Sequence, residues 1–164
     1  MGEYIIKKCS SARPWSSEEL SMLQGLNKDS LHSLTRRNVR RYQRENTLWV
    51  VRETEQKTIV GMASLTLIHT LDPSQTFGIL HSVEFGEAFD DNPSLEKKLR
   101  RMMIEEVIDY ASKKKLQYIQ VASAFGGKQA SELYPGVGFT RVAHSSNAVH
   151  GRNFDHLYIF ARAG

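Results

Sequence analysis

The chain has 164 residues, of which 40% are hydrophobic and 24% are charged, and its net charge is +4. These values are those of a globular protein of one domain, and the mild positive excess is compatible with an anionic ligand without requiring one. The apolar stretches are too short for a transmembrane helix, the first residues lack the pattern of a secretion signal, and Cys9, a lone cysteine, excludes an internal disulfide. The sequence therefore predicts a single domain over residues 1–164, located in the cytoplasm.

The first half of the chain predicts one strand, two helices and then three strands. Residues 4–9 have the composition of a strand, and Ser16 or Ser17 can cap the helix that follows. A second helix is expected to begin at Asp29 or Ser30 and to continue through a run of arginines. Segments rich in β-branched and aromatic residues, separated by short polar turns, predict three consecutive strands at 47–52, 58–67 and 77–85.

The second half begins with the strongest helical signal in the chain. Asn92 is a preferred cap, Pro93 is tolerated at the first helical position, and apolar residues then recur on one face as far as the lysines at 113–115. A strand at 117–122, a short helix at 128–134 ended by Pro135 and Gly136, and a strand hairpin formed by 139–143 and 155–161 complete the prediction. This order of elements is mixed α/β rather than doubly wound.

Three segments carry a recognisable pattern at consistent spacing. Residues 59–65 read Ile-Val-Gly-Met-Ala-Ser-Leu, the strand at 80–85 leads into the long helix, and residues 130–139 follow the pattern Ala-x-x-Leu-Tyr-x-x-x-Gly-Phe. Together they resemble the Gcn5-related N-acetyltransferases (GNAT superfamily) over nearly the whole chain. The resemblance implies one GNAT-like domain with an acyl-CoA N-acyltransferase-like fold. Its central sheet is mostly antiparallel, with a splayed parallel strand pair and helices on both faces.

The resemblance also implies a reaction, in which acetyl-CoA or another acyl-CoA gives its acyl group to a primary amine of a small molecule or peptide by direct attack. Tyr134 stands where the family has the tyrosine that protonates the leaving thiolate, and a phenol with a pKa near 10 suits that role. His81 stands where the family often has a glutamate base, with Glu84 as a fallback on the opposite strand face. The alternatives are a packed tyrosine and a histidine bonded to a neighbouring residue.

The resemblance assigns the cofactor arm to the backbone at the end of the fourth strand, formed by Val83, Glu84, Phe85 and Gly86. The following loop departs from the family, because residues 87–98 contain no glycine, include four acids, and lose one donor at Pro93. The phosphates would then be held by Lys97, Lys98 or Lys128. If they are not held, the alternative is a catalytically inactive GNAT-fold protein that binds or regulates a partner.

Five arginines lie between positions 36 and 44, and no acid occurs before Glu45. One interpretation is recognition of an anionic partner, with Arg37 and Arg41 on the substrate side. The other is a solvated helix face. A dedicated nucleic-acid surface is not favoured, because aromatic residues are not interleaved with the arginines beyond Tyr42.

The remaining polar residues give no sign of a metal centre or of a membrane surface. The histidines have no metal-ligand spacing on a regular element, so no metal is assigned. The oligomeric state stays open, a homodimer included.

Overall fold

The computed structural model describes residues 3–10, 14–26, 36–72, 75–123, 128–144, 148–149, 152–153 and 156–161. Among these residues no helix is long and apolar enough to cross a membrane. The chain forms two compact units, the first made of residues 1–65 and 83–103 and the second of 66–82 and 104–164. Two long strands and the longest helix pass from one unit into the other, and a single domain over the whole chain stays a prediction.

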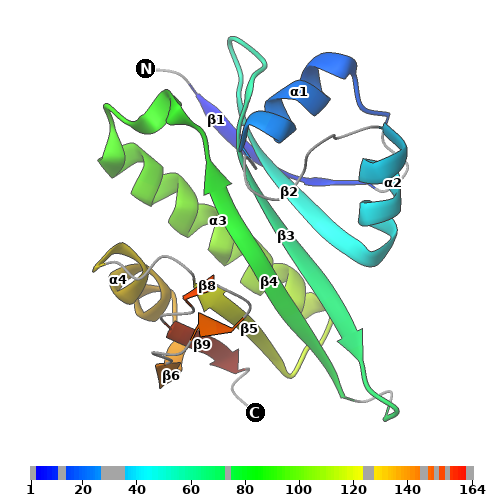
Figure 1. Ribbon diagram of the computed structural model, residues 1–164, viewed down its shortest axis with the longest axis vertical. Helices are drawn as coiled ribbons and strands as arrows, with labels where there is room; N and C mark the ends of the chain where they lie inside the picture. The colour runs from blue at the N-terminus through cyan, green and yellow to red at the C-terminus, as the bar shows by residue number, and fades with distance from the viewer. Residues whose placement is uncertain are drawn as a thin grey trace. The chain divides into compact units, whose positions relative to one another are not determined.

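The helices and strands follow the expected order (Figure 1). In chain order they are β1 (Tyr4–Cys9), α1 (Ser17–Leu26), α2 (Arg36–Glu45), β2 (Asn46–Glu53), β3 (Ile59–His69), β4 (Thr76–Phe85), the 3₁₀ turn η1 (Glu87–Phe89), α3 (Pro93–Lys113), β5 (Tyr118–Ser123), α4 (Lys128–Gly136), β6 (Thr140–His144), β7 (Ala148–Val149), β8 (Arg152–Asn153) and β9 (His156–Ala161). The mixed α/β class is confirmed.

Seven strands form one sheet in the order β1-β2-β3-β4-β5-β9-β6, and β7 and β8 form a separate small pair. The pairs β1–β2, β5–β9 and β6–β9 are antiparallel, whereas β4 and β5 are parallel. The parallel ladder runs from Gly78 opposite Ile119 to Leu80 opposite Val121, and β4 continues for several residues beyond it. The mostly antiparallel sheet with one parallel pair is therefore confirmed, and the splaying of that pair stays a prediction.

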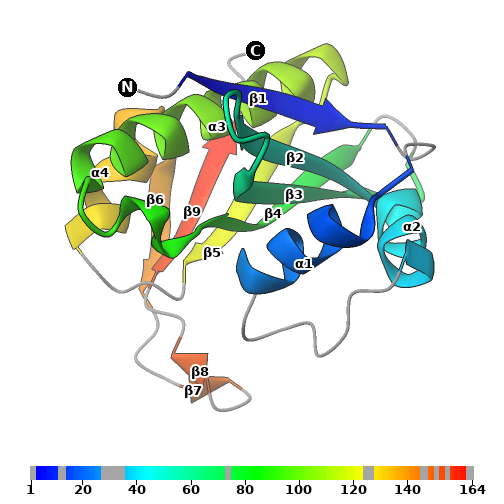
Figure 2. The ribbon, with the colours of Figure 1, turned by 90° about the horizontal axis from the view of Figure 1, so that it is seen from above.

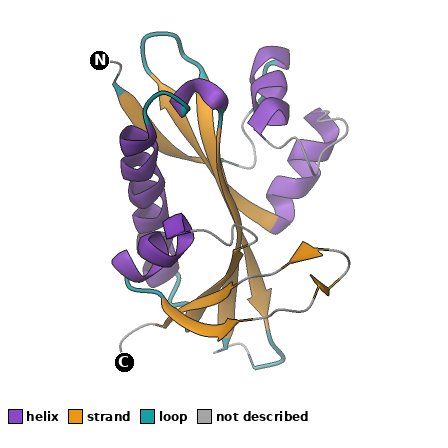
Figure 3. Ribbon diagram, turned by 60° about the vertical axis from the view of Figure 1, so that its left-hand side comes forward, coloured by secondary structure: helices purple, strands orange, loops and turns teal. Residues whose placement is uncertain are grey.

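In the first unit, α1 and α2 cover one face of the strands, and the first half of α3 covers the other (Figures 2 and 3). The α1–α2 face buries one apolar cluster, whose members come from both helices, from the chain before α1, and from β1, β2 and β3. They are Cys9, Trp15, Leu20, Leu23, Val39, Leu48, Val50, Ile59 and Met62. Alternate residues of β2, such as Trp49 and Val51, are also buried, so this strand is apolar on both faces.

The start of α1 follows from its sequence. The Glu19 N–H donates to Ser16 Oγ at 3.1 Å, and the Ser16 N–H donates back to Glu19 Oε2 at 3.0 Å. This reciprocal pair is a capping box, and it satisfies two amides that a helix start leaves without intrahelical partners. Trp15 and Leu20 stand at the two positions that commonly pack together across such a cap, and both belong to the buried cluster. The prediction of a cap at Ser16 or Ser17 is confirmed at Ser16.

The second unit has β5 between β4 and β9, and β9 also pairs with β6 as the expected hairpin. α4 contacts β6 and carries an aromatic side chain onto β9. The helix runs through Pro135 to Gly136, two residues beyond the predicted end at 134. It ends with the Phe139 N–H bonded to the Tyr134 carbonyl at 3.0 Å and with Gly138 at φ +97°, the left-handed conformation that favours glycine.

Two expectations fall partly outside the described residues. The helix predicted from Asp29 or Ser30 is described from Arg36 onward, because 27–35 are not described. The long tip of the last hairpin includes the two-residue strands β7 and β8, which pair with each other. The other predicted boundaries agree with the structure to within about two residues, as is usual for element ends.

Candidate active site

His81 lies on β4 in the second unit and is exposed. Its Nε2 atom is 2.5 Å from Thr66 Oγ1 on β3. Partial burial of the ring lowers the pKa of His81 below its ordinary value of 6.5, because desolvation disfavours the imidazolium. A neutral imidazole at pH 7 can accept a proton, as the base role requires, and the contact with Thr66 fixes the ring. The same contact also agrees with the alternative in which His81 is a structural histidine bonded to a neighbouring residue.

Tyr134 lies on α4, also in the second unit, and its side chain is 7% exposed. Its ring centroid is 4.9 Å from that of Tyr158 and 5.5 Å from that of Phe139, with the Phe139 ring at an edge-on angle. Such aromatic contacts stabilise a unit beyond the burial of their area. Tyr134 is therefore a packing residue of the second unit, and its role as the acid stays a prediction.

The end of β4 lies in the first unit, and its backbone groups have partners within the chain. The Val83 carbonyl accepts a hydrogen bond from the Arg100 guanidinium, which also pairs with Glu96. The same guanidinium lies over the Phe85 ring, 5.0 Å from its centroid. The Gly86 N–H donates to the Val60 carbonyl at 3.0 Å. Two of the groups predicted to hold a cofactor arm thus serve the protein itself.

We expect Arg100→Ala to lower the free energy of unfolding by about 2 kcal/mol, because a charged donor would be lost from a carbonyl on the buried residue Val83. Urea denaturation measures this change. Lys113→Ala is the matched control on the same helix, since Lys113 also pairs with an acid four residues before it but is exposed. Equal effects of the two substitutions would show that the bond to Val83 contributes nothing.

The glycine-free loop has its own packing. Phe89, the last residue of η1, is 2% exposed. Its ring centroid lies 5.5 Å from that of Phe85, in an edge-on arrangement, and 5.8 Å from that of Tyr4 on β1. An aromatic anchor of this kind holds the loop against the sheet. The packing of Phe89 therefore contributes to the conformation of this glycine-free loop.

The first amides of α3 are similarly occupied. Pro93 has no N–H, the Leu95 N–H donates to Asn92 Oδ1 at 3.2 Å, and the Glu96 N–H donates to the Asn92 carbonyl at 3.2 Å. A helix start can bind phosphate through its first amides, and the Leu95 amide already has a partner within the chain. That the phosphates are held by side-chain charge stays a prediction.

The cationic candidates lie on three helices. Lys97 and Lys98 are exposed in the first turns of α3, and Arg37 and Arg41 are exposed on α2. Lys128 is the first residue of α4, and its side chain lies outside what the structure describes. Within the described part of the chain, no group of three or more histidine, cysteine, aspartate or glutamate residues could hold a metal ion.

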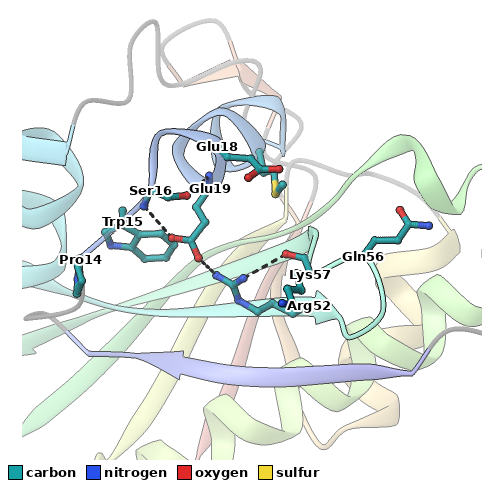
Figure 4. A pocket seen from close by; sticks show the side chains of 9 residues that line it. Pro14, Trp15, Ser16, Glu18, Glu19, Arg52, Gln56 and Lys57 are labelled. Atoms are coloured by element: carbon teal, nitrogen blue, oxygen red, sulfur yellow. Dashed lines mark hydrogen bonds and ion pairs between the residues drawn. The ribbon is translucent and has the colours of Figure 1, made fainter.

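An open cavity of about 610 Å³ lies in the first unit, beside the start of α1 and the β2–β3 turn (Figure 4). None of the predicted site residues lines it. Figure 4 shows Glu19 reaching Arg52, whose guanidinium also donates to the Lys57 carbonyl. The partly buried charges of Glu19 and Arg52 therefore neutralise each other, and their ion pair connects the helix cap to β2.

Sequence reasoning missed the contacts of three residues beside the candidate groups, namely Arg100 and Phe89 in the first unit and Thr66 in the second. Arg100 stands four residues after Glu96, a spacing that predicts their ion pair on a helix. Its bond to Val83 has no comparable signal, because the two residues meet only in the folded protein. Phe89 could have been recognised as the one large apolar residue in an acidic loop.

No protein-family model matches the chain, and no curated protein matches it. Many solved structures do. The NatC complex bound to Gag peptide and CoA superposes with a TM-score of 0.74 at 11% identity, covering 98% of this chain and 99% of that chain. Arabidopsis thaliana NAA60 in complex with acetyl-CoA has a TM-score of 0.69 at 13% identity, covering 97% of this chain and 98% of that chain. A GNAT family acetyltransferase from Elizabethkingia anophelis with acetyl-CoA bound has a TM-score of 0.63 at 12% identity, also covering 97% of this chain and 98% of that chain.

These likenesses extend over nearly the whole of each chain. Their sequence identities are low, so they establish the fold of this chain and do not establish its chemistry. The chain has the fold of the GNAT acetyltransferases, and the resemblance read from the three sequence segments is confirmed at that level.

Proposed function

We propose that this protein is an acyl-CoA-dependent N-acyltransferase that acetylates a primary amine of a small molecule or peptide. The observation that carries the proposal is the pairing of a GNAT fold with a neutral histidine on β4 and a tyrosine on α4, both within the second unit. The bound CoA or acetyl-CoA named for several similar structures supports the choice of donor. An amine acceptor loses a proton as it attacks the thioester, and His81 can accept that proton.

In this proposal, acyl-CoA supplies an activated thioester. His81 accepts the proton of the attacking amine, directly or through one water, and its bond to Thr66 Oγ1 keeps the ring oriented. Tyr134 gives its phenolic proton to the departing sulfur as the C–S bond breaks, so that CoA leaves as the neutral thiol. Lys97, Lys98 and Lys128 hold the phosphates by charge, and Val83, Glu84, Phe85 and Gly86 border the cofactor arm.

We expect His81→Ala to remove the acidic limb of the pH profile of kcat/KM and to lower kcat/KM about 100-fold at pH 7. Because burial lowers the pKa of His81, that limb in the parent protein should fall below pH 6.5. Rates measured from pH 5 to 9 give the comparison. Thr66→Val tests whether the contact with Thr66 orients the His81 ring, since it removes the hydroxyl and keeps the shape of the side chain. An acidic limb that is identical in His81→Ala would exclude His81 as the base.

Calorimetric titration with acetyl-CoA is the experiment that tests the function. Binding at micromolar to sub-millimolar concentration is expected, and Lys97→Gln with Lys98→Gln should weaken it at least about tenfold, because charge-assisted bonds to phosphate are lost. The matched control neutralises Lys113 and Lys114 at the other end of the same helix, and it should bind as the parent does. Absence of heat with the parent protein at hundreds of micromolar acetyl-CoA would contradict the proposal.

The second candidate is a catalytically inactive relative that uses the fold to bind or regulate a partner. The observations that favour it are the occupied groups at the end of β4 and the start of α3: the Val83 carbonyl, the Gly86 amide and the Leu95 amide. In the inactive relative, the bond of Arg100 to Val83 and the packing of Phe89 on Phe85 are permanent contacts of the fold. A crystal structure from a soak with acetyl-CoA separates the two, because density for the cofactor along the end of β4 would favour the transferase and its absence would favour the inactive relative.

A further inference from the structure

The exposed side of α2, from Arg37 to Arg44, carries four arginines and no acid. Arg37, Arg40, Arg41 and Arg44 are all exposed, and together they form what we call the α2 basic face. Across the described residues, none of these four guanidinium groups takes part in an ion pair. Arginines four apart on a helix are neighbours, so Arg37 repels Arg41 and Arg40 repels Arg44. No ion pair from these four groups to another described residue offsets this repulsion.

The opposite side of α2 fixes the helix firmly to the unit. Val39 and Gln43 are buried, at 3% and 6% exposed. The Gln43 side chain accepts a hydrogen bond from Trp15 Nε1 at 3.0 Å and donates one to the Ser10 carbonyl at 3.3 Å. The Tyr42 hydroxyl donates to Ser64 Oγ on β3 at 2.6 Å. The arginines are therefore presented by a rigid support, which reduces the entropy lost when they bind a partner.

We propose that the α2 basic face binds an acidic segment of a partner protein. The guanidinium group matches a carboxylate through two parallel hydrogen bonds, and four such groups match a short run of aspartates and glutamates. From Arg37 to Arg44 the helix rises by roughly 10 Å, which is the span of about three residues of an extended peptide. The proposed base and acid, His81 and Tyr134, do not lie on α2, so binding of the acidic segment can be measured without acyl transfer.

A nucleic acid is the less suitable occupant. Single-stranded nucleic acid is held by aromatic side chains on which bases stack, together with cations along the backbone. On α2 the aromatic residue is Tyr42, whose hydroxyl is already bonded to Ser64 and whose side chain is 36% exposed. Four arginines within two helical turns also contact few phosphates of a duplex. The positive charge is thus concentrated within about two helical turns, which suits a short acidic peptide better than a nucleic acid.

Fluorescence anisotropy with a labelled peptide of about twelve residues, rich in aspartate and glutamate, tests the proposal at about 50 mM and 200 mM salt. We expect binding that weakens as salt is raised, since exposed charges are screened. Arg37→Gln with Arg41→Gln should weaken it about tenfold. The control, Lys7→Gln with Lys113→Gln, removes the same charge from exposed positions on β1 and α3, and its binding should match that of the parent.

Circular dichroism of both double variants confirms that each is folded, and glutamine is a good helix former, so α2 should persist. A peptide with asparagine and glutamine in place of the acids should not bind. Three results would overturn the proposal: equal loss in both double variants, no binding of the acidic peptide by the parent, or tighter binding of a single-stranded RNA of similar length. The last result would assign the α2 basic face to nucleic acid instead.

Discussion

Tyr134→Phe should lower the turnover number for acetyl transfer about 100-fold, with acetyl-CoA affinity nearly unchanged. The substitution removes one oxygen and keeps the ring that packs on Tyr158 and Phe139. If the phenol gives its proton to the departing thiolate, its loss affects the step in which the C–S bond breaks and leaves the ground-state complex as it was. Steady-state kinetics with acetyl-CoA, together with calorimetry for the affinity, make the measurement.

Tyr158→Phe is the matched control, because it deletes the same group from the neighbouring ring of the same aromatic cluster. Tyr158 is fully buried on β9, and burial raises the pKa of its hydroxyl. We expect this variant to keep turnover within a few-fold of the parent. If Tyr134→Phe also stays within a few-fold, Tyr134 is a packing residue alone. If both variants lose turnover equally, the cause is the stability of the cluster.

The fold was predictable where its signals are local. The α1 cap is encoded by Ser16 and Glu19 three residues apart, and the α3 start by Asn92 before Pro93. β2 and most of β3 are apolar on both faces, and their composition identifies them without knowledge of their neighbours. Local chemistry of this kind acts within a few residues, which is why it can be read from the sequence.

The environment of the site was less predictable, because its contacts join residues far apart in the chain. Arg52 pairs with Glu19, 33 positions earlier, and Arg100 bonds to Val83, 17 positions earlier. Sequence alone identifies these side chains as charged but does not assign their partners. The absence of a glycine cradle was evident from the sequence. That the loop is instead anchored by Phe89 depends on Tyr4 and Phe85 being adjacent in the fold.

Phe89→Ala should lower the free energy of unfolding of the first unit by about 3–5 kcal/mol, the usual cost of truncating a buried phenylalanine. The ring is 2% exposed and meets two other aromatic rings, so its removal leaves a cavity and also loses their mutual attraction. Urea unfolding followed by tryptophan fluorescence measures the change. The signal reports on the correct unit, because Trp15 and Trp49 are both buried in it.

Two further variants give the Phe89 result its meaning. Phe89→Leu keeps much of the apolar volume, so a smaller loss of about 1–2 kcal/mol is expected if packing is the cause. Met102→Ala truncates a large apolar side chain that is 40% exposed on α3, and it should change stability little. If Met102→Ala lowers the free energy of unfolding as much as Phe89→Ala does, or if Phe89→Ala does not lower it, the loop is not held by its aromatic anchor. The acidic segment would then be free to rearrange around a bound phosphate, and the occupied amides at the start of α3 would describe just one of its conformations.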